Sequence, residues 1–233
     1  MHIKGLQKLT LLDFPSRLAA TVFTGGCNLR CPFCHNASLV LQNIPEIDVR
    51  EVLSFLKKRQ GILEGVCITG GEPLLQPDLE DFIREIKKLG YKVKLDTNGS
   101  LPEKLERIIS RNLVDYVAMD IKNSPKKYFS TCGMQGQNFE EFYSPFKKSI
   151  ELLKGSGVEY EFRTTVVREL HTLSDIEEIG AEIRGAAAWY LQCFKDSGDL
   201  ILKDTFSPPT RQELEEMLKK AREFAVKCDI RGV

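Results

Sequence analysis

The chain alternates between short apolar segments and longer segments with apolar residues at helical spacing, and this alternation restricts its fold more than any other feature. Six strand-like segments are predicted, at 17–24, 65–69, 91–97, 114–120, 158–167 and 187–194. A helix-like segment follows each of them, which favours parallel strands because the helix provides the right-handed crossover. The sequence therefore predicts an α/β fold. Periodicity alone leaves two arrangements open, a doubly wound open sheet and a partial barrel.

The predicted helices lie at 48–61, 76–90, 101–112, 138–157, 172–185 and 210–227. Asp48 and Gly61 are suited to begin and end the first helix. Thr210 and Glu213 have the spacing of a capping box at the start of the last helix. Pro145 predicts a break or an internal start within its helix, because proline has no amide hydrogen to donate.

The length of the chain fits one domain. It has 233 residues, and no repeat, low-complexity stretch or linker divides it. We expect a single domain over residues 1–233, with a core at 17–227 and an N-terminal extension at 1–16. The segment 122–137 is predicted to be a long irregular loop.

The charge and hydropathy of the chain argue against several classes of protein. Lys and Arg balance Asp and Glu, 33 against 33, so a basic surface for nucleic acid or for an anionic membrane is not expected. The N-terminal residues lack the apolar core of a signal peptide, and no apolar run is long enough to span a membrane. We therefore expect a cytoplasmic protein. Its seven cysteines, an odd number, are not expected to form a disulfide framework.

The residues that suggest chemistry come where predicted strands end. A cysteine-rich loop, 25–36, follows the first strand, and the segments GGEP (70–73), DTNG (96–99) and DIK (120–122) follow or end the next three. Arg163 lies within the fifth. Active sites of parallel α/β folds form where the carboxyl ends of the strands meet. These segments are therefore expected to converge on one site.

The cysteine-rich loop, GGCNLRCPFCHN, holds three of the seven cysteines. Iron–sulfur clusters are usually bound by four cysteine thiolates. Cys27, Cys31 and Cys34 would hold such a cluster and leave one iron without a protein ligand, and an open position on a metal is where chemistry occurs. Phe33, between two of the cysteines, is suited to shield the cluster from water.

A structural zinc site is the alternative interpretation of this loop. Zinc prefers four ligands in a closed tetrahedral site, and the loop supplies three thiols. His35 directly follows Cys34, and neighbouring side chains rarely point at one metal. Because no second CxxC pair follows, a non-enzymatic zinc or Fe–S binding module is the less favoured hypothesis.

The segment CNLRCPFC resembles the CxxxCxxC signature of radical S-adenosylmethionine (SAM) enzymes, including the aromatic residue before the last cysteine. The resemblance implies that Cys27, Cys31 and Cys34 bind a [4Fe–4S] cluster whose open iron is chelated by SAM. Electron transfer from the cluster then cleaves SAM to methionine and a 5′-deoxyadenosyl radical. The fold that the resemblance implies is a single-domain partial (β/α)6 barrel of the TIM type with a parallel sheet.

GGEP resembles the segment that binds the methionine part of SAM in this family. Gly70 and Gly71 lack side chains where the ligand approaches the backbone, Glu72 offers a carboxylate to the ligand's ammonium group, and Pro73 favours an extended conformation at the residue before it. Taken alone, GGEP is also a common strand-to-helix turn. Its position one strand–helix unit after the cysteine loop favours the functional interpretation.

Further positions are implied by the resemblance to glycyl-radical activating enzymes. Asp96, Thr97 and Asp120 are expected to hold a monovalent cation beside the cofactor carboxylate. Lys122 and Arg163 resemble cationic residues that contact the cofactor. Three more residues complete the expected cofactor site: Phe33, His35, which extends the match as CPFCHN, and Asn98. The alternatives are a surface ion pair for the cations, a hydrogen-bonded loop residue for His35 and a simple turn at Asn98–Gly99.

Within the family, the whole chain resembles the activating protein of anaerobic (class III) ribonucleoside-triphosphate reductase. The segment before the first strand is DFPS, whereas formate-lyase activases usually have a DGPG-like segment there. Phe194 lies in the neighbourhood where those enzymes resemble a pattern with a histidine, and residues 35–66 lack the extra cysteines of dehydratase-type activases. The expected partner is therefore a large glycyl-radical enzyme, with flavodoxin or ferredoxin as electron donor. The alternatives are a pyruvate formate-lyase-type activase and a radical SAM enzyme for a small molecule, similar to 7-carboxy-7-deazaguanine synthase.

Overall fold

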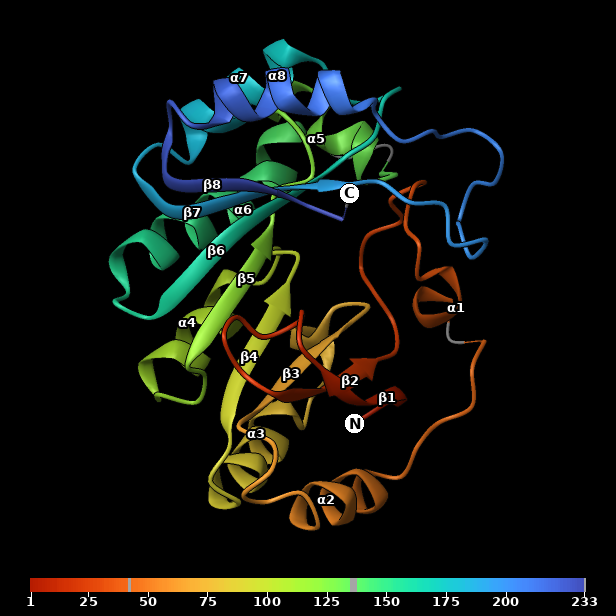
Figure 1. Ribbon diagram of the computed structural model, residues 1–233, viewed down its shortest axis with the longest axis vertical. Coiled ribbons are helices and arrows are strands. Elements are labelled where there is room, and N and C mark those ends of the chain that lie inside the picture. The colour runs from red at the N-terminus through yellow and green to blue at the C-terminus, as the bar shows by residue number, and fades with distance from the viewer. Residues whose placement is uncertain (42, 135–137, 233) are drawn as a thin grey trace. The chain divides into compact units, whose positions relative to one another are not determined.

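The computed structural model describes residues 1–41, 43–134 and 138–232. The strands are β1 (Ile3–Thr10), β2 (Ala19–Thr24), β3 (Gly65–Gly70), β4 (Lys92–Thr97), β5 (Tyr116–Asp120), β6 (Glu159–Val166), β7 (Ala186–Cys193) and β8 (Ala225–Arg231). The helices are α1 (Ala37–Val40), α2 (Val49–Lys57), α3 (Leu79–Lys88), α4 (Pro102–Ser110), α5 (Pro125–Thr131), α6 (Phe139–Gly155), α7 (Leu173–Glu182) and α8 (Arg211–Ala221), with a 3₁₀ turn, η1, at Pro73–Leu75. Figure 1 shows these elements in chain order.

The strands follow one another in the sheet in chain order, from β1 to β8. β1 is antiparallel to β2, while the pairs β2–β3, β3–β4, β6–β7 and β7–β8 are parallel. Contacts divide the chain into two compact units. Unit 1 comprises residues 1–28, 38–97 and 103–118, and unit 2 comprises 29–37, 98–102 and 119–233. The two units share β5, whose last two residues, Met119 and Asp120, belong to unit 2.

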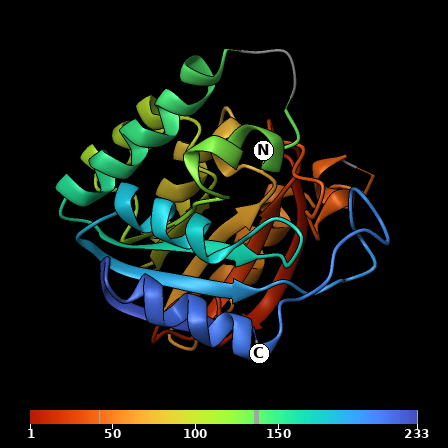
Figure 2. The ribbon, with the colours of Figure 1, turned by 90° about the horizontal axis from the view of Figure 1, so that it is seen from above.

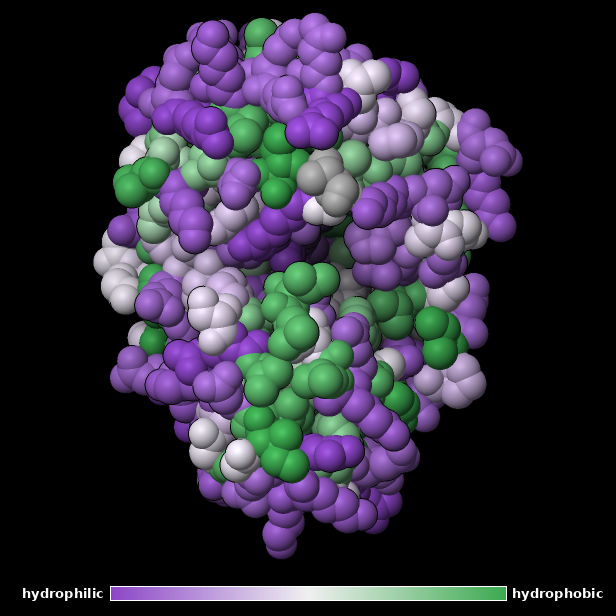
Figure 3. All heavy atoms as spheres, in the orientation of Figure 1, coloured by the Kyte–Doolittle hydropathy of each residue, from purple (hydrophilic) through white to green (hydrophobic). Residues whose placement is uncertain are grey.

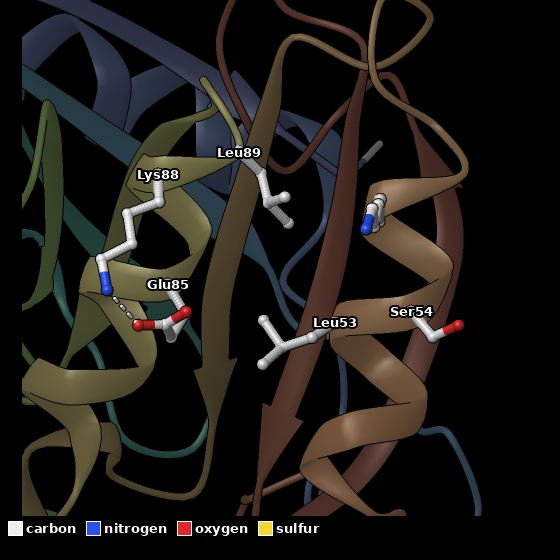
Figure 4. Close-up of a pocket in the computed structure, with 6 residues that line it drawn as sticks. Leu53, Ser54, Glu85, Lys88 and Leu89 are labelled. Carbon is white, nitrogen blue, oxygen red and sulfur yellow. Dashed lines mark hydrogen bonds and ion pairs between the residues drawn. The ribbon is translucent and has the colours of Figure 1, made fainter.

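In unit 1, the parallel strands form the interior and helices cover them. β2 and β3 consist mostly of buried apolar or small residues, as is typical of parallel strands that are covered on both faces. α2 and α3 are amphipathic and pack against each other, with Leu56 of α2 and Ile83 and Ile86 of α3 fully buried. A shallow groove between these helices is lined by Leu53, Ser54, Glu85, Lys88 and Leu89, none of which is a predicted site residue (Figure 4).

In unit 2, α8 packs on β7 and β8 and lies beside α7, as Figures 1 and 2 show. α5 packs against α6 through aromatic rings. The ring centroid of Tyr128 lies 4.7 Å from that of Phe146 and 5.0 Å from that of Tyr143. All three side chains are buried, so that this aromatic group anchors α5 and the segment that follows Asp120.

The six predicted strands are present as β2 to β7, but β1 and β8 were missed. β1 lies within the predicted N-terminal extension. β8 begins inside the last predicted helix, 210–227, because the observed helix α8 already ends at Ala221. β8 contains no fully buried residue, and most of the middle of β1 is exposed or half-buried. β1 and β8 have mixed polar and apolar sequences, so they lack the apolar run that marks strands such as β2 and β3.

The predicted helix ends were partly right. The Asp48 carboxylate accepts a hydrogen bond from the Arg50 amide, and Thr210 and Glu213 form the predicted capping box. Gly61 does not end its helix, which stops at Lys57. Likewise, α6 runs without a break through Pro145. The predicted loop at 122–137 contains α5, and its residues 135–137 lie outside the described part of the chain.

Leucine side chains are exposed at the end of β1 and in the connection to β2. Leu9, Leu11, Leu12 and Leu18 are between 39% and 86% exposed, and Figure 3 shows hydrophobic side chains gathered over this region. The group lies where β2 begins, at the opposite end of that strand from the cysteine-rich loop. Within the described residues, no helix is both long and apolar enough to cross a lipid bilayer.

Candidate cofactor site

The predicted site residues fall into both units. Unit 1 contains Cys27, Gly70, Gly71, Glu72, Pro73, Asp96 and Thr97. Unit 2 contains Cys31, Phe33, Cys34, His35, Asn98, Asp120, Lys122 and Arg163. The cysteine motif is therefore divided, with its first thiol in unit 1 and the other two in unit 2. Each group is described within its own unit.

In unit 1, the turn after β3 is bonded to the start of the cysteine-rich loop. The Gly71 amide donates to the Thr24 carbonyl at 3.0 Å, and the Glu72 amide donates to the Gly26 carbonyl at 2.8 Å. A Cβ atom at Gly71 would lie 1.9 Å from the Gly26 carbonyl oxygen. This contact leaves no room for a side chain, which explains the second glycine of GGEP. The structure thus brings GGEP next to the residue that precedes Cys27.

Glu72 has a structural task in this turn. Its side chain is fully buried, and Oε1 accepts hydrogen bonds from the Leu74 amide at 3.0 Å and from the Thr97 hydroxyl at 2.9 Å. Pro73 begins η1, for which Glu72 is the N-terminal cap. The carboxylate therefore joins the end of β3 to the end of β4. That it also binds the ammonium group of a ligand stays a prediction.

Asp96 forms a buried ion pair that the sequence analysis missed. Lys94, two residues earlier on β4, is 1% exposed, and its ammonium group contacts the Asp96 carboxylate. Residues two apart on a strand share a face. The sequence alone does not mark this pair, because β4 (KVKLDT) carries two lysines, and only the fold shows that Lys94 is enclosed while Lys92 is exposed.

In unit 2, the loop that carries Cys31 and Cys34 is held by backbone hydrogen bonds. The Cys34 amide donates to the Cys31 carbonyl at 3.0 Å, which closes a turn around Pro32 and Phe33. The Arg30 amide donates to the Cys132 carbonyl at 2.9 Å. This bond ties the loop to the end of α5.

The thiols of this loop lie in contrasting surroundings. A hydrogen bond with the Cys132 thiol lowers the pKa of Cys31, against the opposing effect of burial, and the charge of Lys122 lowers it further. Burial raises the pKa of Cys34, and Lys122 opposes this shift. Cys132 comes from the segment predicted to be an irregular loop, where nothing in the sequence indicated its position beside Cys31.

Asp120, Lys122 and Arg163 form a charged triad in unit 2. Lys122 Nζ lies 2.8 Å and Arg163 Nε 2.9 Å from the two carboxylate oxygens of Asp120. Burial alone would raise the pKa of Asp120, but the charges of Arg163 and Lys122 outweigh it and hold that pKa well below its usual range. Burial would lower the pKa of Lys122, but Asp120 and Cys31 raise it. The ammonium group therefore stays charged near the thiols.

His171 supports this triad, although its place in the sequence suggested a surface position. That expectation was wrong, because its ring is 3% exposed. Nε2 donates to the Lys122 carbonyl at 2.9 Å, while Nδ1 accepts from the Val167 amide at 3.1 Å. Burial lowers the pKa of His171, in keeping with a neutral ring that has one donor and one acceptor.

The remaining predicted residues have local partners in unit 2. Phe33 is buried and packs edge-on against Phe206, with centroids 6.4 Å apart. Asn98 Oδ1 accepts from the Ser100 amide at 2.9 Å, which forms the side-chain turn weighed as the simpler alternative. His35 is exposed as a residue, but partial desolvation of its ring and the charge of Lys122 lower its pKa.

The sequence profile of the Radical SAM superfamily matches residues 21–183. The chain belongs to this superfamily. A protein of Methanocaldococcus jannaschii, provisionally named a glycyl-radical enzyme activating enzyme, is 34% identical over 239 residues, which cover 99% of this chain and 96% of that protein. The pyruvate formate-lyase-activating enzyme of Clostridium pasteurianum is 29% identical over 184 residues, covering 76% of this chain and 72% of that enzyme.

The fold of this radical SAM protein is also found in solved structures. The crystal structure of Streptococcus suis SuiB bound to its precursor peptide SuiA superposes with a TM-score of 0.69 at 16% identity, over 95% of this chain and 50% of SuiB. At this identity the likeness shows the fold alone. The predicted α/β class and partial barrel are confirmed, as a mostly parallel sheet of eight strands.

The cofactors of a radical SAM enzyme are a [4Fe–4S] cluster and SAM. The donor set of this chain fits them, because three soft thiols on one loop are suited to iron–sulfur ligation, and Lys122 stabilises thiolate charge at two of them. Within the described ranges, no three His, Cys, Asp or Glu side chains are arranged to hold a single metal ion. A cluster binds each thiolate through a different iron, so its ligands need not converge on one point.

Proposed function

We propose that this radical SAM protein is an activase that installs a glycyl radical on a class III anaerobic ribonucleoside-triphosphate reductase. The observation that carries the proposal is the similarity, over 99% of the chain, to a protein named as a glycyl-radical enzyme activating enzyme. The choice of reductase rests on the sequence alone: DFPS at 13–16, Phe194, and the lack of cysteines at 35–66.

When bound, the cluster and SAM supply one-electron cleavage of SAM and removal of a hydrogen atom from the partner's glycine Cα. The chain's own residues bind and orient these groups. Cys27, Cys31 and Cys34 are the proposed ligands of the cluster. The Gly70–Pro73 turn, pressed against Gly26, presents backbone rather than side chains to the methionine part of SAM.

The charged triad is proposed to hold the cofactor's polar groups. Asp120 orients both Lys122 and Arg163 through its two carboxylate oxygens, so that neither cation needs to reorganise when an anionic group binds. Lys122 also lies near Cys31 and Cys34 and stabilises their thiolates. Burial of Cys31 and the packing of Phe33 on Phe206 are proposed to exclude water from the cluster.

The test is anaerobic reconstitution with iron, sulfide, SAM, a reductant and the purified reductase, followed by electron paramagnetic resonance. A doublet that depends on SAM and on the reductase, and that is lost on substitution of the partner's glycine, is expected. Cys31→Ala should abolish it, whereas Cys228→Ser, a cysteine of β8 outside the site, should not. Flavodoxin and ferredoxin are the electron donors to compare.

The outcomes separate the alternatives. A radical formed on pyruvate formate-lyase but not on the reductase would correct the partner. Formation of 5′-deoxyadenosine stimulated by a small molecule, with no radical on either protein, would indicate an enzyme of the small-molecule type. If the reconstituted protein holds zinc and never cleaves SAM, the proposal is wrong.

A further inference from the structure

The inner face of β4 carries a lysine that is almost completely enclosed. Lys94 is 1% exposed, and lysine is almost never fully buried unless it is paired. Its ammonium group contacts the Asp96 carboxylate and lies 3.9 Å from Cys67 Sγ on the neighbouring strand β3. Cys67 and Lys94 are register partners in the sheet. The position of the ammonium group is therefore set by two rigid strands.

This pair changes the expectation for Asp96. A buried carboxylate needs a compensating positive charge, because an unpaired charge in the protein interior is strongly destabilising. The resemblance to glycyl-radical activating enzymes implied that a monovalent metal ion supplies this charge at Asp96, Thr97 and Asp120. In the structure, Asp96 is only 8% exposed and already forms an ion pair with the ammonium group of Lys94, a side chain of the same strand.

The other two residues of the expected cation site are also engaged. Within unit 1, the Thr97 hydroxyl donates a hydrogen bond to Glu72 Oε1 at 2.9 Å. Asp120 holds two cationic side chains of unit 2, Lys122 and Arg163. Each carboxylate of the expected set thus has a cationic side chain from its own unit as its counter-ion.

We infer that the Lys94 ammonium group is the cation of this site. It neutralises Asp96 in place of a monovalent metal ion and keeps a fixed positive charge at the carboxyl end of β4, one strand from the Gly70–Pro73 turn. An ammonium group and a potassium ion carry the same charge, so removal of the side chain should leave a place that a small cation from solution can fill. We further infer that this charge favours binding of SAM through the SAM carboxylate, and this step rests on the proposed function.

The first experiment needs no cofactor. Thermal unfolding of the full chain is followed in KCl, NaCl and choline chloride at one ionic strength, since choline is too large to enter a buried site. The unfolding temperature of the wild type should agree among the salts to within about 1 °C, whereas Lys94→Met should gain about 3 °C in KCl or NaCl over choline chloride. Adding Asp96→Asn to Lys94→Met should remove this gain.

Lys92→Met is the matched control. Lys92 lies on the same strand, but its side chain is 52% exposed and pairs with Asp115 at the surface. Its loss should produce no preference among the three salts, and Lys94→Arg should behave as the wild type. A wild type stabilised by K⁺ or Na⁺ over choline would overturn the inference, and so would a Lys94→Met protein that gains nothing from either ion. If Lys94→Met does not fold, the unfolding temperatures of the wild type in the three salts still test the inference.

The second experiment measures SAM binding to the reconstituted protein by calorimetry in the same salts. The dissociation constant of the wild type should change by less than about twofold among them, whereas that of Lys94→Met should rise about tenfold in choline chloride and recover in KCl. A wild type that binds SAM only with K⁺ or Na⁺ would contradict the inference. A wild type that binds no SAM in any salt would contradict the proposed function instead, and the unfolding experiment would still judge Lys94.

Discussion

The predicted site residues of unit 1 and those of unit 2 are held in place by different physical means. In unit 1, the turn after β3 is shaped by backbone contacts, with Gly71 pressed against Gly26 and two amides bonded to neighbouring carbonyls. In unit 2, the site around Cys31 is shaped by charge, because Asp120 holds Lys122 and Arg163 in a half-buried triad. The turn at Gly71 depends on the absence of a side chain, whereas the triad depends on the charges of its three side chains.

This difference determines what each region tolerates. The turn at Gly71 has no room for a methyl group. A charged cluster tolerates a substitution that keeps the charge. It does not tolerate one that removes the counter-charge, even at equal size, because the remaining charges are then left partly buried without a partner. Substitutions that change only volume, only charge or only protonation therefore test the comparison directly.

Asp120→Asn is expected to have the largest effect. The amide is almost the same size as the carboxylate but leaves Lys122 and Arg163 without their counter-ion, so the free energy of unfolding should fall by about 3 kcal/mol. Denaturant unfolding measures this loss. Glu215→Gln, which removes an exposed partner of Arg211 on α8, should change stability by less than about 0.5 kcal/mol. Equal effects of the two substitutions would show that charge does not shape unit 2.

Gly71→Ala should have the next largest effect. Its Cβ would lie 1.9 Å from the Gly26 carbonyl oxygen, so the turn must shift, and the free energy of unfolding should fall by about 2 kcal/mol. Gly155→Ala at the end of α6 is the control, because a Cβ there meets nothing within 4 Å. It should be neutral or stabilise the protein by up to about 1 kcal/mol. A Gly71→Ala protein as stable as the wild type would mean that the turn is not set by this contact.

The sequence predicts best what depends on neighbours along the chain. β2 and β3 were recognisable because they consist mostly of apolar or small residues. The cap at Asp48 and the capping box at Thr210 are local hydrogen-bond patterns. The approach of GGEP to the cysteine-rich loop followed from parallel strands, which bring their carboxyl ends to one edge. β8 was missed because none of its residues is fully buried and it lacks an apolar run, so the predicted helix before it was extended into its first residues.

The parts of the site that were missed depend on partners distant in the sequence. His171 bonds to the Lys122 carbonyl across 49 residues, and Cys132 meets Cys31 from a segment without strand or helix periodicity. The partner of Lys94 is two residues away, but whether a lysine of β4 faces inward depends on the register of the sheet. Only the folded chain shows which polar side chains are enclosed together.

The pH dependence of stability gives the smallest expected effect and tests whether His171 belongs to the group of residues whose charge shapes unit 2. Burial lowers the pKa of His171 below its usual value, so the unfolded chain takes up a proton before the folded chain does as the pH falls. This contribution to stability is fully present above about pH 6.5 and is lost as the pH falls through and below that value. Protonation also removes the acceptor for the Val167 amide, a hydrogen bond that contributes about 1 kcal/mol.

The free energy of unfolding of the wild type should therefore decrease between about pH 7.5 and about pH 5.5, and His171→Gln, which does not titrate, should show a smaller decrease. Gly155→Ala is the control, because it neither adds nor removes a titrating group and its Cβ meets nothing within 4 Å; its slope should match that of the wild type. If His171→Gln keeps the wild-type slope, the ring does not lose its bond to Val167 on protonation. Asp120 would then be the residue that orients Lys122, and His171 would not belong to the group of residues whose charge shapes unit 2.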